Sequence, residues 1–105
     1  SGLNGPSFAF NGYLPIDRLE RKKRIKELER ISKMANQTQL FIETPYRNDK
    51  MLDDLIEVCE KSTLLTISVD LTGATERIVT KPVGQWKKGE LVLGKRPTMF
   101  GFLAV

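Results

Sequence analysis

The chain alternates between segments with strand-like and helix-like spacing of apolar residues, and this alternation constrains its fold more than any other feature. Strand-like runs occur at residues 8–14, 39–43, 64–71, 76–80 and 98–105. Amphipathic helices are expected in the first two gaps, at 18–35 and 48–61. The order β-α-β-α-β-β-β predicts an α/β fold with a mixed sheet of about five strands and flanking helices, partly parallel and ending in antiparallel strands.

The first helix carries the clearest local signals. Asp17 is placed to cap its amino end, and Glu20 follows three residues later, as in a capping box. Apolar residues recur along it at spacings of three and four, at Ile25, Leu28, Ile31 and Ala35. We expect this helix to end near Asn36, and we expect Asn48 or Asp49 to cap the second helix.

The residue types present exclude several kinds of chemistry. The 105 residues include no histidine, which removes His-based general acid–base catalysis, Ser/His/Asp triads and the commonest zinc sites. Cys59 is the only cysteine, so neither an internal disulfide nor a Cys-rich metal site is available. We therefore predict no metal site and expect Cys59 to be a buried small apolar residue.

The charge balance permits an anionic partner without requiring one. There are 17 Lys and Arg against 13 Asp and Glu, a net charge of +4. The basic run Arg21–Arg24 is of the kind that binds phosphate groups. The acidic residues interleaved along the same helix favour instead a solvated face on which the charges form ion pairs. No apolar run approaches the ~18–20 residues that span a membrane, so we expect no membrane partner and a cytoplasmic location.

Polar residues gather where two of the predicted strands end. Glu43 and Arg47 flank a proline-containing turn after the second strand, and Asp70 ends the third. Ligands of open α/β sheets collect at the carboxyl ends of parallel strands, so Glu43 and Arg47 are candidate catalytic residues and Asp70 a candidate acceptor for a ribose hydroxyl or an amine. The alternatives are a local ion pair, with Tyr46 packed on the following helix, and an Asp70 that only satisfies loop N–H groups.

The aromatic residues are expected to pack in the core rather than to stack on bases. These are Trp86, in a short helical turn expected within residues 82–88, and the phenylalanines Phe8, Phe10, Phe41, Phe100 and Phe102. The third strand is apolar at several successive positions, as in a strand covered on both faces.

Three segments together resemble a known enzyme family. They are SGLNGPSFAFNGYLP, QLFIETPYR, and a strand end VDLT followed by TER. The combination is similar to the bacterial ribosomal RNA small-subunit methyltransferase I group of the tetrapyrrole (corrin/porphyrin) methylase superfamily, the class III S-adenosylmethionine-dependent methyltransferases. The similarity extends from Ser1 to about Val79 and is looser beyond that point.

The resemblance implies an enzyme of two α/β domains that binds S-adenosylmethionine in the cleft between them. This chain, residues 1–105, then corresponds to the C-terminal domain alone, and the absent N-terminal domain is an expected partner. The matching motif positions imply donor contacts at Ile42, Glu43, Thr44, Pro45, Asp70 and Leu71. They imply cleft-lining positions at Tyr13, Leu14, Pro15, Tyr46 and Arg47. Asp70 departs from a family pattern that has Glu there.

Three functions remain open on the sequence. The first is methylation of a ribosomal RNA ribose 2′-oxygen, with Glu43 and Arg47 organising the cleft and the catalytic base unassigned. The second takes a tetrapyrrole or another small molecule as methyl acceptor. The third is a non-enzymatic binding or dimerisation module that uses the apolar C-terminal strand. The resemblance also implies a homodimer, and the domain alone is expected to fold but to have little activity.

Overall fold

The computed structural model describes residues 7–70, 73 and 75–105, and the predicted order of elements is confirmed. The strands are β1 (Ser7–Tyr13), β2 (Gln37–Ile42), β3 (Leu64–Val69), β4 (Arg77–Pro82) and β5 (Thr98–Leu103). The α-helices are α1 (Arg18–Ala35) and α2 (Asn48–Val58), and two short 3-10 turns are η1 (Pro45–Arg47) and η2 (Val83–Gln85). Among the described residues, no helix is both long enough and apolar enough to cross a membrane.

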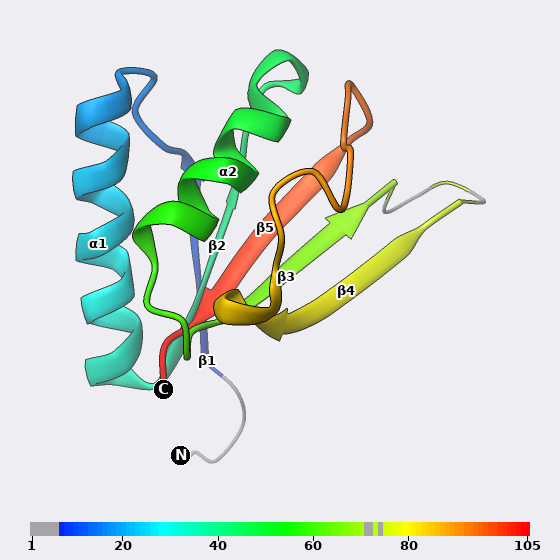
Figure 1. The fold of residues 1–105 in the computed structure, drawn as a ribbon. Helices are drawn as coiled ribbons and strands as arrows, with labels where there is room; N and C mark the ends of the chain where they lie inside the picture. The colour runs from blue at the N-terminus through cyan, green and yellow to red at the C-terminus, as the bar shows by residue number, and fades with distance from the viewer. Residues whose placement is uncertain (1–6, 71–72, 74) are drawn as a thin grey trace.

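The five strands form one mixed sheet in the order β1-β2-β5-β3-β4. Only β1 and β2 pair in parallel, and the other three pairings are antiparallel. The last strand, β5, therefore separates β2 from β3. Because β1, β2 and β3 still run in the same direction, their carboxyl ends meet at one edge of the sheet, at the top of Figure 1. We call this edge the carboxyl edge.

One face of the sheet is covered by both helices and by the segment from η2 to Leu93 (Figure 1). Phe41 lies at the centre of this buried face, with its ring 5.7 Å from that of Phe100 and 5.8 Å from that of Phe102, measured between ring centroids. Trp86 is buried there too, as predicted, and its indole Nε1 donates to the carbonyl of Lys81. These residues form a single core between the sheet and the helices.

The opposite face, which we call the outer face, is covered by no element that the structure describes. Phe8 is 57% exposed and Phe10 is 61% exposed, so the prediction that both belong to the core is wrong. The reason is the two-residue period of a strand: Phe8 and Phe10 pair with Thr38 and Leu40, on the side away from the helices. β3 likewise alternates buried and half-buried residues, so it is covered on one face and not on both.

The first helix begins and ends as predicted. The Asp17 carboxylate accepts a hydrogen bond from the Glu20 backbone N–H at 3.0 Å, and Asn36 ends the helix in the left-handed region at φ 50°. The buried side of α1 is less apolar than its pattern predicted, because Ala35 is exposed and Ser32 is fully buried. The Ser32 hydroxyl accepts a hydrogen bond from Ala104 N, which ties α1 to the chain beyond β5.

Candidate functional site

The carboxyl edge brings most of the predicted site residues together. Tyr13, at the end of β1, pairs with Ile42, at the end of β2, so the exits of these two strands are adjacent. Asp70 ends β3 on the other side of β5, and its backbone N–H donates to the carbonyl of Pro97 at 2.8 Å. Leu71, a predicted donor contact, lies outside the described residues.

Glu43 and Arg47 form a local pair at the exit of β2. The Glu43 side chain is 1% exposed, and its Oε1 accepts a hydrogen bond from Thr44 N at 2.7 Å. The Nε of Arg47 lies 3.3 Å from the same Oε1, which is within ion-pair range, but its N–H is not aligned for a hydrogen bond. The predicted Glu–Arg pair is therefore present as an electrostatic contact rather than a bidentate bridge.

Besides the Nε of Arg47, three polar atoms of this segment are buried without a hydrogen-bond partner among the described residues. They are Oε2 of Glu43, Oγ1 of Thr44 and Oδ1 of Asn48. All three accept hydrogen bonds, and only the threonine hydroxyl also donates. A buried acceptor without a partner lowers the stability of the folded state. We therefore expect a water, a ligand or another part of the protein to donate hydrogen bonds to this segment.

Asn48 and Asp49 do not cap α2 through their side chains, and that prediction is wrong. Asn48 Nδ2 instead donates to the carbonyls of Gly94 and Arg96, at 3.3 and 3.0 Å. The Asp49 carboxylate accepts from the backbone N–H groups of Leu93 and Gly94, at 2.7 and 3.1 Å. Both side chains therefore fasten the loop before β5 to the start of α2, across more than forty positions of sequence.

Asp70 has an uncommon backbone conformation, and its carboxylate contacts two side chains. Its φ of 54° lies in the left-handed region, which is uncommon for a residue other than glycine. Its Oδ2 accepts from the hydroxyl of Thr75 at 3.0 Å and lies 3.7 Å from Nη1 of Arg96. The Asp70 carboxylate thus contacts two side chains rather than the loop N–H groups that the simpler alternative named, and Arg96 connects it to the loop that Asn48 holds.

The residues predicted to line a cleft differ in exposure. Tyr46 is 78% exposed and does not pack on the following helix. Lys95 lies over it, with its Nζ 5.2 Å from the centroid of the Tyr46 ring. Tyr13 and Pro15 are also exposed, whereas Leu14 is part of the core. Tyr13, Pro15 and Tyr46 are therefore open to a ligand at this edge, and the Leu14 side chain is not.

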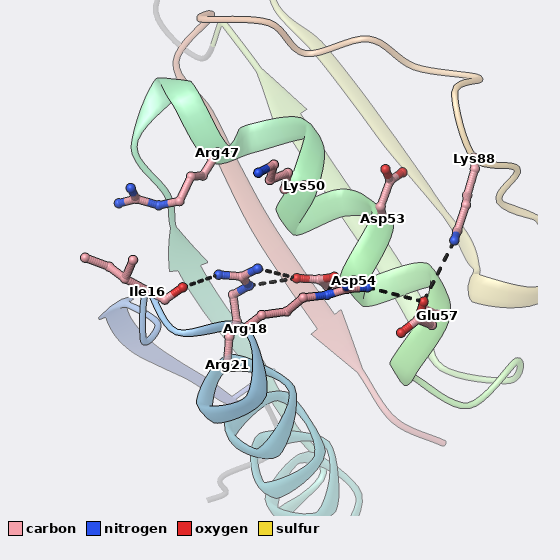
Figure 2. Close-up of a pocket in the computed structure, with 9 residues that line it drawn as sticks. All are labelled: Ile16, Arg18, Arg21, Arg47, Lys50, Asp53, Asp54, Glu57 and Lys88. Carbon is pink, nitrogen blue, oxygen red and sulfur yellow. Dashed lines mark hydrogen bonds and ion pairs between the residues drawn. The ribbon is translucent and has the colours of Figure 1, made fainter.

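A groove of about 460 Å³ lies beside the carboxyl edge, between the start of α1 and α2 (Figure 2). Its lining residues are Ile16, Arg18, Arg21, Arg47, Lys50, Asp53, Asp54, Glu57 and Lys88. Figure 2 shows some of the charges of this groove paired with one another, whereas Arg47, Lys50 and Asp53 have no partner among the residues drawn. Oε1 of Glu57 lies 3.7 Å from Nη2 of Arg18 and 3.9 Å from Nζ of Lys88. A hydrogen bond from Lys22 lowers the pKa of the Glu57 carboxyl group below its usual range.

The basic run of α1 is not free to follow a phosphate backbone. Arg21 is buried and bonded to Asp54, Lys22 pairs with Glu57, and Arg24 pairs with Glu27. Every basic residue from Arg18 to Lys26 has a carboxylate partner. For residues 18–26 the structure therefore supports the ion-paired interpretation, whereas Arg30 and Lys33, farther along α1, have no ion pair among the described residues.

Comparisons with known proteins find two curated relatives and a solved structure of similar fold. No family model matches the chain. Ribosomal RNA small subunit methyltransferase I of Vibrio cholerae serotype O1 is 32% identical, over 89% of this chain and 34% of that protein. The protein of the same name from Escherichia coli O157:H7 is 29% identical, over 89% of this chain and 35% of its own length.

A solved structure, that of the methyltransferase CobJ, has the same fold. It superposes with a TM-score of 0.53 at 13% sequence identity and covers 94% of this chain and 46% of CobJ. The chain thus spans about a third of the curated relatives it matches and less than half of the structural neighbour. The resemblance inferred from the sequence is confirmed: most of the chain is similar to part of ribosomal RNA small subunit methyltransferase I, and its fold is that of the methyltransferase CobJ.

Proposed function

We propose that this chain is the C-terminal domain of a two-domain S-adenosylmethionine-dependent methyltransferase that acts on ribosomal RNA, and that the donor binds at the carboxyl edge. The observation that carries the proposal is the set of unpaired buried acceptors at Glu43, Thr44 and Asn48. They lie at the exit of β2, where the ETPYR motif of the family resemblance occurs, and beside the exit of β1.

The chemistry of the donor fits these acceptors. S-adenosylmethionine carries an ammonium group, two ribose hydroxyls and an exocyclic amine, all of which donate hydrogen bonds. Glu43 Oε2, Asn48 Oδ1 and the Thr44 hydroxyl would hold such donors, directly or through an ordered water. When bound, the donor supplies an electrophilic methyl group, and the protein's task is to orient it toward the acceptor.

This chain's own residues serve that task by position rather than by proton transfer. Glu43 is held by Thr44 N and lies against Arg47, so its carboxylate keeps one orientation. Arg47 in turn lines the groove next to α1. With no histidine in the chain, we assign no general base here, and the remaining two thirds of a relative's length are expected to provide one.

Ribosomal RNA is the proposed acceptor because both curated relatives are named for it. A cytoplasmic location follows from that substrate. The alternative acceptor, a tetrapyrrole or another small molecule, keeps the same donor and the same edge. A homodimer is also proposed, from the family resemblance alone.

Calorimetry of the full-length protein with S-adenosylmethionine tests the donor site. Glu43→Ala should weaken donor binding by about tenfold or more, which corresponds to ~1.4 kcal/mol. Glu27→Ala is the matched control, because Glu27 is an exposed carboxylate of α1 whose partner, Arg24, lies outside the site. Wild-type donor affinity in a folded Glu43→Ala protein would contradict the proposal.

The acceptor is tested by transfer of a labelled methyl group. Full-length protein is incubated with labelled donor and either ribosomal RNA from a methylation-deficient strain or a corrin or porphyrin precursor. We expect label in the RNA alone. Label in the small molecule would replace ribosomal RNA with the alternative, and donor binding without either transfer would reject both acceptors.

A further inference from the structure

Tyr46 and Lys95 form an exposed aromatic and cationic pair at the carboxyl edge. Tyr46, in η1, is 78% exposed, and its ring is among the most exposed apolar surfaces of the domain. The Nζ of Lys95 lies 5.2 Å from its centroid, within the range of a cation–π contact. The two residues come from different parts of the chain, one after β2 and the other before β5, so only the folded domain brings them together.

The backbone on both sides of this pair is held in place. Pro45 precedes Tyr46 and fixes the start of η1. The carbonyls of Gly94 and Arg96, immediately before and after Lys95, both accept from Asn48 Nδ2. Asp49 additionally accepts from Gly94 N. The side chains of Asn48 and Asp49 are thus used to fasten the Lys95 loop to the helix that follows Tyr46, which presents the pair as a preformed surface.

The charge around this pair is less compensated than that of α1. Neither Lys50 nor Lys95 has a carboxylate within ion-pair distance among the residues that the structure describes, and both are exposed. By contrast, the cations of α1 from Arg18 to Lys26 all have carboxylate partners. In the described part of the chain, unpaired positive charge therefore lies at the exposed tyrosine, whereas α1 has it only near its carboxyl end, at Arg30 and Lys33.

We propose that Tyr46 and Lys95 are an RNA-docking platform, on which an unpaired base stacks against the Tyr46 ring while Lys95 and Lys50 contact the adjacent phosphates. An exposed aromatic ring beside cations is the combination that binds single-stranded nucleic acid without needing a sequence code. The proposal rests on the proposed methyltransferase function, because it assigns the substrate-contacting residues of that same edge. A structured duplex offers no free base face, so the platform selects a single-stranded or flipped-out nucleotide.

Binding of a fluorescein-labelled oligouridine of about 12 nucleotides to the full-length protein, followed by anisotropy, tests the platform. Tyr46→Ala should weaken binding by about tenfold or more, whereas Tyr46→Phe keeps the ring and should bind within about twofold of wild type. Lys95→Gln should weaken binding and reduce the slope of log affinity against log salt by about 0.7 for each phosphate that the protein no longer neutralises. Lys33→Gln, an exposed lysine near the far end of α1, is the charge-matched control and should change neither quantity.

The outcomes separate this inference from the proposed function. Thermal unfolding of each variant establishes that it is folded, which exposed positions should permit. If wild-type protein binds S-adenosylmethionine but Tyr46→Ala and Lys95→Gln bind RNA as wild type does, the platform is refuted and the methyltransferase function stands. If wild type binds the donor and no oligouridine, the platform is again refuted. Absence of donor binding in wild type refutes the methyltransferase function itself.

Discussion

Arg21 of α1 donates from its Nε to Oδ2 of Asp54 on α2 over 2.7 Å, and both side chains are 5% exposed. The Nη2 of the same guanidinium also lies 2.7 Å from Oδ2, and Nη1 donates to the carbonyl of Ile16 at 2.8 Å. This buried pair joins the two helices directly under the groove in Figure 2. A residue that the sequence places in a basic surface run is therefore a structural contact between helices.

Replacing Asp54 by Ala should lower the free energy of unfolding by about 3–5 kcal/mol, because it leaves the Arg21 charge buried without its partner. Asp53→Ala is the control, since Asp53 is the neighbouring acidic residue and is exposed. Urea unfolding followed by circular dichroism measures both. A loss for Asp54→Ala no larger than that of the control would show that the pair contributes nothing to stability.

Replacing Asp49 by Ala should release the loop before β5. The change removes the acceptor of two backbone N–H groups, those of Leu93 and Gly94, and should cost about 1–3 kcal/mol. Hydrogen exchange at these two amides should become faster, while amides in β3 keep their protection. Unchanged exchange at Leu93 and Gly94 would show that Asp49 does not hold the loop that carries Lys95.

Phe41→Ala and Phe10→Ala should differ sharply although both remove a phenyl ring from a strand. Phe41 is fully buried between Phe100 and Phe102, so its loss should cost about 3–5 kcal/mol. Phe10 is 61% exposed on the outer face, and its loss should cost well under half as much. Thermal or urea unfolding of the two variants gives the comparison. Equal losses would mean that the outer face is covered in the protein as tested.

The Cys59 thiol should resist alkylation until the domain unfolds. Burial raises the pKa of Cys59 above the ordinary thiol value of 9.0, so at pH 8 the reactive thiolate is present only in the unfolded chain. Below pH 9 the Cys59 thiol is protonated in both the folded and the unfolded state, so it does not change the free energy of unfolding. As the pH rises above 9, the unfolded state loses the proton first and the free energy of unfolding falls. Labelling with iodoacetamide at pH 8, with and without urea, checks the first point. Rapid labelling of folded protein would contradict it.

Local features of the fold are accessible from the sequence because they depend on neighbouring residues. The boundaries of α1 follow from Asp17 at one end and Asn36 at the other. The 3-10 turn before Trp86 and the short strand β4 are likewise predictable. The exit of β2 at Glu43 and Arg47 is found for the same reason, since strand, proline and charged pair lie within one short segment.

The features that the sequence does not predict depend on contacts between distant residues. The alternation along a strand separates its residues into two faces but does not indicate which face the helices cover. It therefore does not predict that Phe8 and Phe10 lie outside the core. Asn48 and Asp49 have the local pattern of caps, whereas their real partners lie in the loop before β5. The pairing of Tyr46 with Lys95 has no sequence signal at all, because only that loop brings the two residues together.

The place of β5 in the sheet has a consequence for synthesis of the chain. β5 is the last strand of this sheet to be made, yet it lies between β2 and β3 and is antiparallel to both. Until residues 98–103 leave the ribosome, the sheet exists at most as two unconnected ribbons, β1-β2 and β3-β4, each with an unpaired edge. The domain therefore completes its fold only after translation has passed this strand, and a nascent chain stalled earlier would expose Phe41 and both open edges to chaperones.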